Sequence, residues 1–223
     1  QEWSAAVAAG RGSHAARMRA AERIHAAMGE LALLCERAPT AVRRKLLGSA
    51  WKRLAAIQLG ADRHGALAEM AACYGAALAE GSGEDDAYAF NNAAVACLLM
   101  ERIEPGAMPP GFGAELATLC ERHIEATLCH HVDAPQLWAA TGLGDLVVVQ
   151  LLLAAGDPER CKALAESTRE KYLDAFARGA SPREMASIRD HLDFLIELTA
   201  DTRIHSPWPA AVRDGLASIR AAI

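Results

Sequence analysis

The segment from Lys45 to Ala77 constrains the fold most, because its apolar residues recur at helical spacing in two consecutive stretches. Each stretch places five apolar side chains along one side of a helix: Leu47, Ala50, Trp51, Leu54 and Ile57, then Leu67, Met70, Ala71, Tyr74 and Ala77. Gly60 is suited to end the first helix, and Asp62 is suited to cap the second. The segment therefore predicts a helix hairpin whose apolar stripes need further helices to cover them.

The same spacing continues along the rest of the chain and predicts roughly nine helices. Ser181-Pro182-x-Glu184 has the pattern of a capping box at the start of one of them. Hydrophobic residues make up 52% of the chain but aromatic residues only 5%, which is typical of helices rich in Ala and Leu. Because most connections are short, the sequence predicts an all-α fold of antiparallel helix hairpins stacked as an α-solenoid.

We expect one helical-repeat domain over residues 1–223, with one strong interruption. Residues 105–113 contain three prolines and three glycines, so this stretch is a candidate subdivision between two halves or a long loop between helices. The chain begins at Gln1, and an initiator Met is not normally removed before so bulky a residue. We therefore expect the chain to be a fragment of a longer protein.

Charge, hydropathy and cysteine placement limit the class of protein. The net charge is −5 with both signs mixed along the chain, and the basic stripe typical of nucleic-acid binding is missing. The longest apolar run, from Leu146 to Ala155, is shorter than the roughly 18 residues that indicate a membrane span. The six cysteines lie mostly in apolar helical stripes, which favours buried thiols in a reducing compartment. The sequence predicts a cytoplasmic protein without a nucleic-acid or membrane partner.

The hairpin resembles a tetratricopeptide repeat. Leu47-Gly48-x-x-Trp51 is similar to the core of that repeat's first helix, and Met70-x-x-x-Tyr74-x-x-Ala77 is similar to its second. Trp138-x-x-Thr141-Gly142 is a weaker match, with Thr where Leu is expected. Gly48, Asn92 and Gly142 are 44 and 50 residues apart, whereas a tetratricopeptide repeat has about 34 residues. The resemblance therefore implies tetratricopeptide-like, degenerate repeats with longer helices.

A second likeness covers most of the chain. Four segments together resemble the helical TRAF-binding-type region of MAP kinase kinase kinases and its bacterial relatives: Leu47–Ala55, Tyr88-x-x-x-Asn92-Ala93-Ala94, Gln136–Leu152, and Tyr172-x-x-Ala175 through Ser181–Glu184. In bacteria such regions are often attached to, or encoded beside, caspase-like, trypsin-like or other effector domains. The resemblance implies a regulatory scaffold, and none of its motifs is catalytic.

Tetratricopeptide geometry would place Lys45, Ser49, Lys52 and Arg53 on the concave face of the first helix. Their three positive charges would suit an acidic peptide or a C-terminal carboxylate, although ordinary surface charge is the alternative. Asn92 lies on the apolar side of its helix. It is either a groove residue that binds a peptide backbone or a buried amide that holds a neighbouring segment.

Cys120-x-x-His123 with Cys129-His130-His131 is the one candidate metal site, since Cys120 and His123 share a helical face. His131 lies eight residues after His123, about 12 Å along a continuous helix, so one ion cannot bind them all unless the helix breaks. The alternative is a buried Cys beside a polar His. No local signature of a nucleophile surrounds the cysteines, and no phosphate-binding loop or other catalytic motif is present.

We therefore expect a non-enzymatic protein-interaction module or regulatory scaffold without a cofactor, which binds a protein or peptide and controls an attached or neighbouring effector such as a protease. Two other hypotheses remain open. One is a metal-binding sensor or enzyme around Cys120 and His123. The other is a self-assembling structural element, because Ala-rich helical faces can stack.

Overall fold

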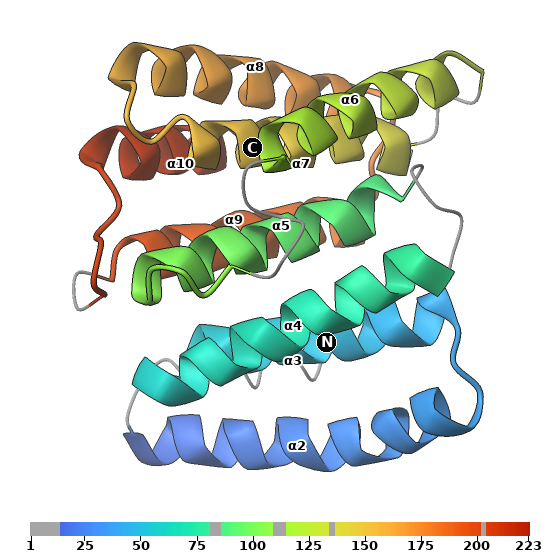
Figure 1. Ribbon diagram of the computed structural model, residues 1–223. Coiled ribbons are helices and arrows are strands. Elements are labelled where there is room, and N and C mark those ends of the chain that lie inside the picture. Colours follow the sequence, from blue (N-terminus) through green and yellow to red (C-terminus); the bar gives the residue numbers. More distant parts are fainter. Residues whose placement is uncertain (1–13, 81–85, 109–114, 134–136, 202–203) are drawn as a thin grey trace. The chain divides into compact units, whose positions relative to one another are not determined.

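The computed structural model describes residues 14–80, 86–108, 115–133, 137–201 and 204–223, with side chains left undescribed over 130–140 (Figure 1). The described residues form helices and no strand, which confirms the all-α prediction. The helices are α2 (His14–Arg37), α3 (Ala41–Ile57), α4 (Gly60–Glu80), α5 (Ala87–Ile103), α6 (Leu116–Asp133), α7 (Leu137–Leu153), α8 (Pro158–Ala177), α9 (Pro182–Thr199) and α10 (Ala210–Ala222). None of the described helices is long and apolar enough to cross a membrane.

The chain divides into two compact units, Gln1–Gly83 and Glu84–Ile223, and each is described by itself. Helices α2 to α4 belong to the first unit, and α5 to α10 belong to the second. The interruption expected at 105–113 lies inside the second unit, between α5 and α6, and its residues 109–113 fall outside the described part. A single domain over 1–223 and the stacking of hairpins into a solenoid stay predictions.

The connection between α3 and α4 lies earlier in the chain than the sequence pattern predicts. Helix α3 ends at Ile57, and Gly60 begins α4 with a φ of +57°, a conformation that suits glycine. The carbonyls at the end of α3 are satisfied by a side chain: the buried Arg63 donates from Nε to the oxygens of Ala55 and Gln58, at 3.1 and 2.8 Å. Asp62 accordingly lies in the first turn of α4 instead of capping it.

Helices α2, α3 and α4 form antiparallel neighbours around the core of the first unit. Ile24 and Met28 from α2 are buried, as are Leu54 of α3 and Tyr74 of α4. Trp51, expected as a core residue, is half-buried and packs edge-on against His25 of α2, with ring centroids 6.1 Å apart. The core prediction is therefore confirmed for Tyr74 and only partly for Trp51. The side chain of Trp138, expected as a third core aromatic, lies outside the described residues.

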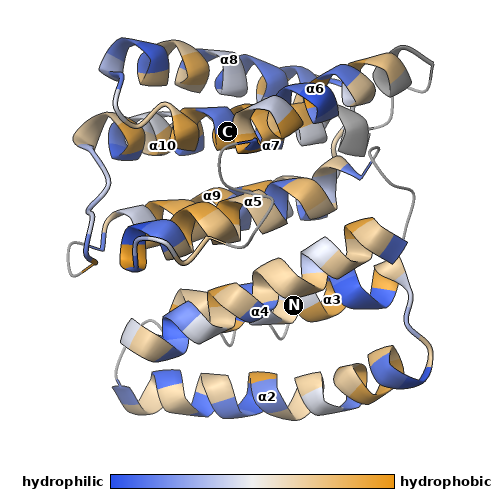
Figure 2. Ribbon diagram, in the orientation of Figure 1, coloured by the Kyte–Doolittle hydropathy of each residue, from blue (hydrophilic) through white to orange (hydrophobic). Residues whose placement is uncertain are grey.

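Helix α7 lies at the centre of the second unit, where it packs against α5, α6 and α8. From Thr141 to Leu152 every residue is buried except Asp145 and Gln150, which are half-buried. Apolar side chains on all sides are expected for a helix that others surround. Figure 2 shows a different pattern on α2, where hydrophilic residues interrupt the visible surface along the helix. Helix α2 of the first unit, with its hydrophilic residues, therefore differs from α7, which other helices surround.

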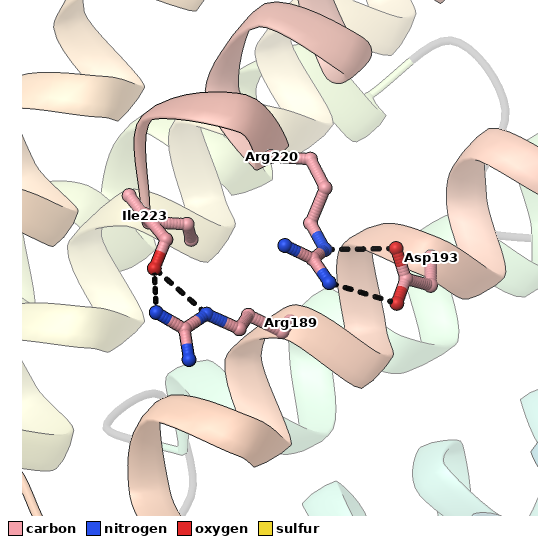
Figure 3. Close-up of polar contacts among 4 residues, drawn as sticks. All are labelled: Arg189, Asp193, Arg220 and Ile223. Carbon is pink, nitrogen blue, oxygen red and sulfur yellow. Dashed lines mark hydrogen bonds and ion pairs between the residues drawn. The ribbon is translucent and has the colours of Figure 1, made fainter. Parts of the chain in front are cut away.

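Two arginines hold α10 against α9 (Figure 3). Arg220 of α10 pairs with both carboxylate oxygens of Asp193 on α9, at 2.8 and 3.3 Å. Arg189, one turn earlier on α9, donates two hydrogen bonds to the carbonyl oxygen of Ile223. A positive charge at the C-terminal end of a helix also complements the helix dipole. The capping box predicted at the start of α9 is confirmed, because Ser181 and Glu184 exchange both hydrogen bonds.

Candidate functional site

The four predicted groove residues on α3 lie within about 100° of helix circumference, at positions i, i+4, i+7 and i+8. All four are half-buried: Lys45, Ser49, Lys52 and Arg53. Arg53 donates from one guanidinium nitrogen to the carbonyl oxygen of Ser49, at 2.8 Å, which holds the guanidinium group along the helix. The structure therefore brings these residues together as one row, which we call the basic row.

Ser49 connects the basic row to the neighbouring helix. Its hydroxyl lies 2.9 Å from the hydroxyl of Tyr74 on α4, so the two are hydrogen-bonded. A Cβ on Gly48, the preceding residue, would lie 2.8 Å from the ring of Tyr74, so the ring can pack this closely only against glycine. Ser49 thus contributes to helix packing, and Lys45, Lys52 and Arg53 supply the charge of the row.

An ion pair fastens the far end of the same hairpin. Arg44 on α3 contacts Glu80 at the end of α4, with 2.5 Å between the guanidinium nitrogen and the carboxylate oxygen. The hydrogen bond from Arg44 lowers the pKa of the Glu80 carboxyl from its ordinary value. The basic row therefore lies on a helix that is held to α4 at its middle and near its N-terminal end.

Asn92 belongs to the second unit, so its position relative to the basic row is not defined. Its side chain is 1% exposed, and Nδ2 donates a hydrogen bond of 2.8 Å to the carbonyl oxygen of Tyr88 one turn earlier. A buried donor must be satisfied within the protein, and this one is. These observations support the buried-amide interpretation of Asn92 over a role in peptide binding.

Cys120 and His123 share a helix but contact different neighbours. The Cys120 thiol is fully buried and donates to the carbonyl oxygen of Leu146 on α7, at 3.4 Å. The His123 ring stacks on Phe90 of α5, with centroids 4.0 Å apart. Within the described residues no group of three or more His, Cys, Asp or Glu side chains is placed to hold a metal ion. The side chains of His130 and His131, the other members of this candidate, lie outside that description.

The buried thiols are poor nucleophiles. Burial raises the pKa of Cys97 and of Cys120 to about 12, and that of Cys73 to about 11. Since the thiolate is the reactive form, these side chains are protonated at neutral pH. Burial also raises the pKa of Cys161, whereas Cys129 is exposed. The structure thus agrees with the interpretation of most cysteines as packing residues.

Among the described residues, each unit has one glycine that packs directly against a tyrosine ring. In the second unit, a Cβ on Gly144 of α7 would lie 2.5 Å from the ring of Tyr172 on α8. The Tyr172 hydroxyl donates to Asp145, the residue after the glycine, at 2.5 Å. Both tyrosines are fully buried. Leu143-Gly144 therefore occupies the position of Leu47-Gly48 in the first hairpin.

The sequence pattern predicts this correspondence two residues earlier, at Thr141-Gly142. A Cβ on Gly142 would meet only the Cβ of Ala87, at an ordinary distance of 3.6 Å, so this glycine is not required by close packing. The spacing between equivalent glycines is consequently 96 residues, from Gly48 to Gly144. The signal that could have found it is Tyr172-x-x-Ala175, which repeats Tyr74-x-x-Ala77.

No protein-family model matches the chain, and neither curated proteins nor solved structures give a match. The resemblances to tetratricopeptide repeats and to the regulatory region of MAP kinase kinase kinases therefore stay predictions.

Proposed function

We propose that this chain is a non-enzymatic, cytoplasmic module that binds a protein or peptide partner, with its hairpins stacked as a tetratricopeptide-like α-solenoid. The observation that carries the proposal is the basic row on α3, where Lys45, Lys52 and Arg53 line one side of a single helix. Three cations spaced along two helical turns suit an acidic peptide segment or a C-terminal carboxylate.

The packing of the hairpin would make this row a preorganised surface. Gly48 allows Tyr74 to pack directly on α3, and the hydroxyls of Ser49 and Tyr74 join the two helices. Arg53 is oriented by its hydrogen bond to the carbonyl oxygen of Ser49. A surface that is ordered before binding loses less conformational entropy on association. The acidic partner would therefore meet a defined pattern of charges.

As a regulatory scaffold, the module would position an attached or neighbouring effector, such as a protease, relative to that partner. This part of the proposal rests on the resemblance to the regulatory regions described above. We do not propose the metal-binding alternative, because Cys120 and His123 contact α7 and α5 respectively.

Affinity capture from the source cell, with the partner identified by mass spectrometry, tests the proposal. The test variant carries Lys52→Glu and Arg53→Glu. The matched control carries Arg19→Glu and Arg23→Glu, which make the same change in charge at exposed positions of α2. We expect the wild-type chain and the control to retain a specific partner that the test variant loses. Equal retention by all three chains, or no specific partner for any of them, would contradict the proposal.

A further inference from the structure

A pocket of about 170 Å³ opens at one end of the α7–α8 hairpin in the second unit. Three helices contribute to it, and its lining residues are Ala117 and Glu121 from α6, Gln150, Leu153 and Ala154 at the end of α7, and Arg160 from α8. This volume is smaller than the roughly 300–1,000 Å³ of sites for drug-sized ligands. It suits a single side chain.

The walls of the pocket are held by local hydrogen bonds. Asp157 caps α8 by accepting from the backbone N–H of Arg160, at 3.0 Å, which places Arg160 in the first turn of that helix. The buried Cys161 thiol donates to the carbonyl oxygen of Ala154, at 3.2 Å. Backbone groups at this end of the hairpin are thus paired within the chain, and the pocket is preformed.

The pocket is lined by apolar side chains together with two residues of opposite charge. Leu153 is 36% exposed, which leaves apolar surface for a ligand to cover. Glu121 on α6 and Arg160 on α8 are both exposed, and neither side chain makes a hydrogen bond or an ion pair with another described residue. Gln150 also lines the pocket, and its half-buried amide can donate and accept hydrogen bonds.

We propose that this pocket binds one aliphatic side chain of a partner peptide, flanked by a basic residue that pairs with Glu121 and an acidic residue that pairs with Arg160. Charge complementarity argues for a peptide of this pattern, because the two lining charges are opposite in sign and come from different helices. The inference rests on the proposed function, since it assumes a peptide partner. The pocket, however, contains no residue of the basic row and belongs to the second unit, whereas the basic row belongs to the first.

Binding of two defined heptapeptides, measured by NMR titration, tests the inference. The first peptide is acetyl-Gly-Lys-Gly-Leu-Gly-Glu-Gly-amide, and in the second Lys replaces the Glu. We expect the first peptide to shift resonances of Ala117, Leu153 and Ala154. Replacing its Leu by Ala should weaken binding about tenfold, because the aliphatic side chain supplies most of the buried surface.

Charge reversal of the protein gives the decisive comparison. Arg160→Glu should weaken binding of the first peptide about fivefold and strengthen binding of the second by a similar factor, as expected for exposed charge pairs. Arg183→Glu, at an exposed position of α9, is the matched control and should change neither affinity. No binding of either peptide, or equal responses of the two arginine variants, would overturn the inference.

The Lys52→Glu, Arg53→Glu variant separates this inference from the proposed function. It should bind the first peptide as the wild-type chain does, because the basic row is not part of the pocket. If the first peptide does not bind, but the Lys52→Glu, Arg53→Glu variant still loses the partner that the wild-type chain captures, only the pocket is excluded. If the peptide binds while all chains capture the same proteins, only the basic row is excluded.

Discussion

The α3–α4 and α7–α8 hairpins share one packing arrangement but use it in different surroundings. In each, a glycine of the first helix contacts a fully buried tyrosine of the second, and the next residue binds the tyrosine hydroxyl. Helix α7 is enclosed by α5, α6 and α8. Helix α3 instead keeps a half-buried basic row. The glycine–tyrosine contact therefore fixes a hairpin, while the residues around it determine whether the first helix becomes core or surface.

The largest effect is expected from exchanging residues between equivalent positions of α3 and α7. With the glycines aligned, Lys52 corresponds to Val148, which is fully buried. Val148→Lys should lower the free energy of unfolding by more than about 3 kcal/mol, because a charge would be buried without a partner. The reciprocal Lys52→Val should change it by less than about 0.5 kcal/mol. Urea denaturation measures both, and similar losses in the two variants would remove the distinction between core and surface helices.

The second effect concerns the two neighbouring glycines of α7. Gly144→Ala should lower the free energy of unfolding by about 2 kcal/mol, because the new methyl group overlaps the Tyr172 ring. Gly142→Ala has room for its methyl group and should be neutral or stabilising by up to about 1 kcal/mol, since Ala favours helix over Gly. If both variants had the same midpoint of urea denaturation, the assignment of Gly144 to the tyrosine contact would be wrong.

The tyrosine hydroxyls should differ between the hairpins. Tyr172→Phe removes a hydrogen bond to the Asp145 carboxylate and should cost about 2 kcal/mol, whereas Tyr74→Phe removes one to the Ser49 hydroxyl and should cost about 1 kcal/mol. The difference reflects the greater strength of hydrogen bonds to charged groups. Chemical denaturation at pH 7 checks the order, and a larger cost for Tyr74→Phe would reverse our interpretation.

The smallest effect is the contribution of Tyr172, the tyrosine of the second hairpin, to the pH dependence of stability. Burial, and then the nearby Asp145 carboxylate, raise the pKa of Tyr172 well above its ordinary value of 10.0. The folded state therefore keeps the phenol protonated where the unfolded state ionises it, and stability should fall as the pH rises above about 10. Tyr172→Phe should lose less stability than the wild-type chain between pH 8 and pH 11. Identical losses would show that Tyr172 does not contribute to this dependence.

Local patterns in the sequence were sufficient for the helices. The capping box at Ser181 and the apolar spacing around Tyr74 depend on residues within a few turns, and both are present in the structure. The end of α3 could not be predicted in this way, because Arg63 caps it from the following helix. The sequence pattern instead predicts that the helix ends at Gly60, which begins α4 in the structure.

Contacts and pockets formed by several helices could not be predicted from the sequence. Gly142 and Gly144 are alike as residues, and only the position of Tyr172 shows which one is closely packed. The pocket combines residues from Ala117 to Arg160 on three helices, and no spacing rule brings them together. For the basic row, the spacing on one helix was enough to place its members on a common side, but the hydrogen bond between Ser49 and Tyr74 was not evident.

Cross-linking with a carbodiimide would test the proposed binding surface most directly, because the reagent joins a lysine only to a carboxylate in contact with it. The chain has four lysines, Lys45 and Lys52 on α3 and Lys162 and Lys171 on α8, so each unit carries an internal control for the other. With the captured partner, we predict cross-links from Lys45 and Lys52 to acidic residues of that partner. Cross-links from Lys162 and Lys171 alone would contradict the assignment of partner binding to α3.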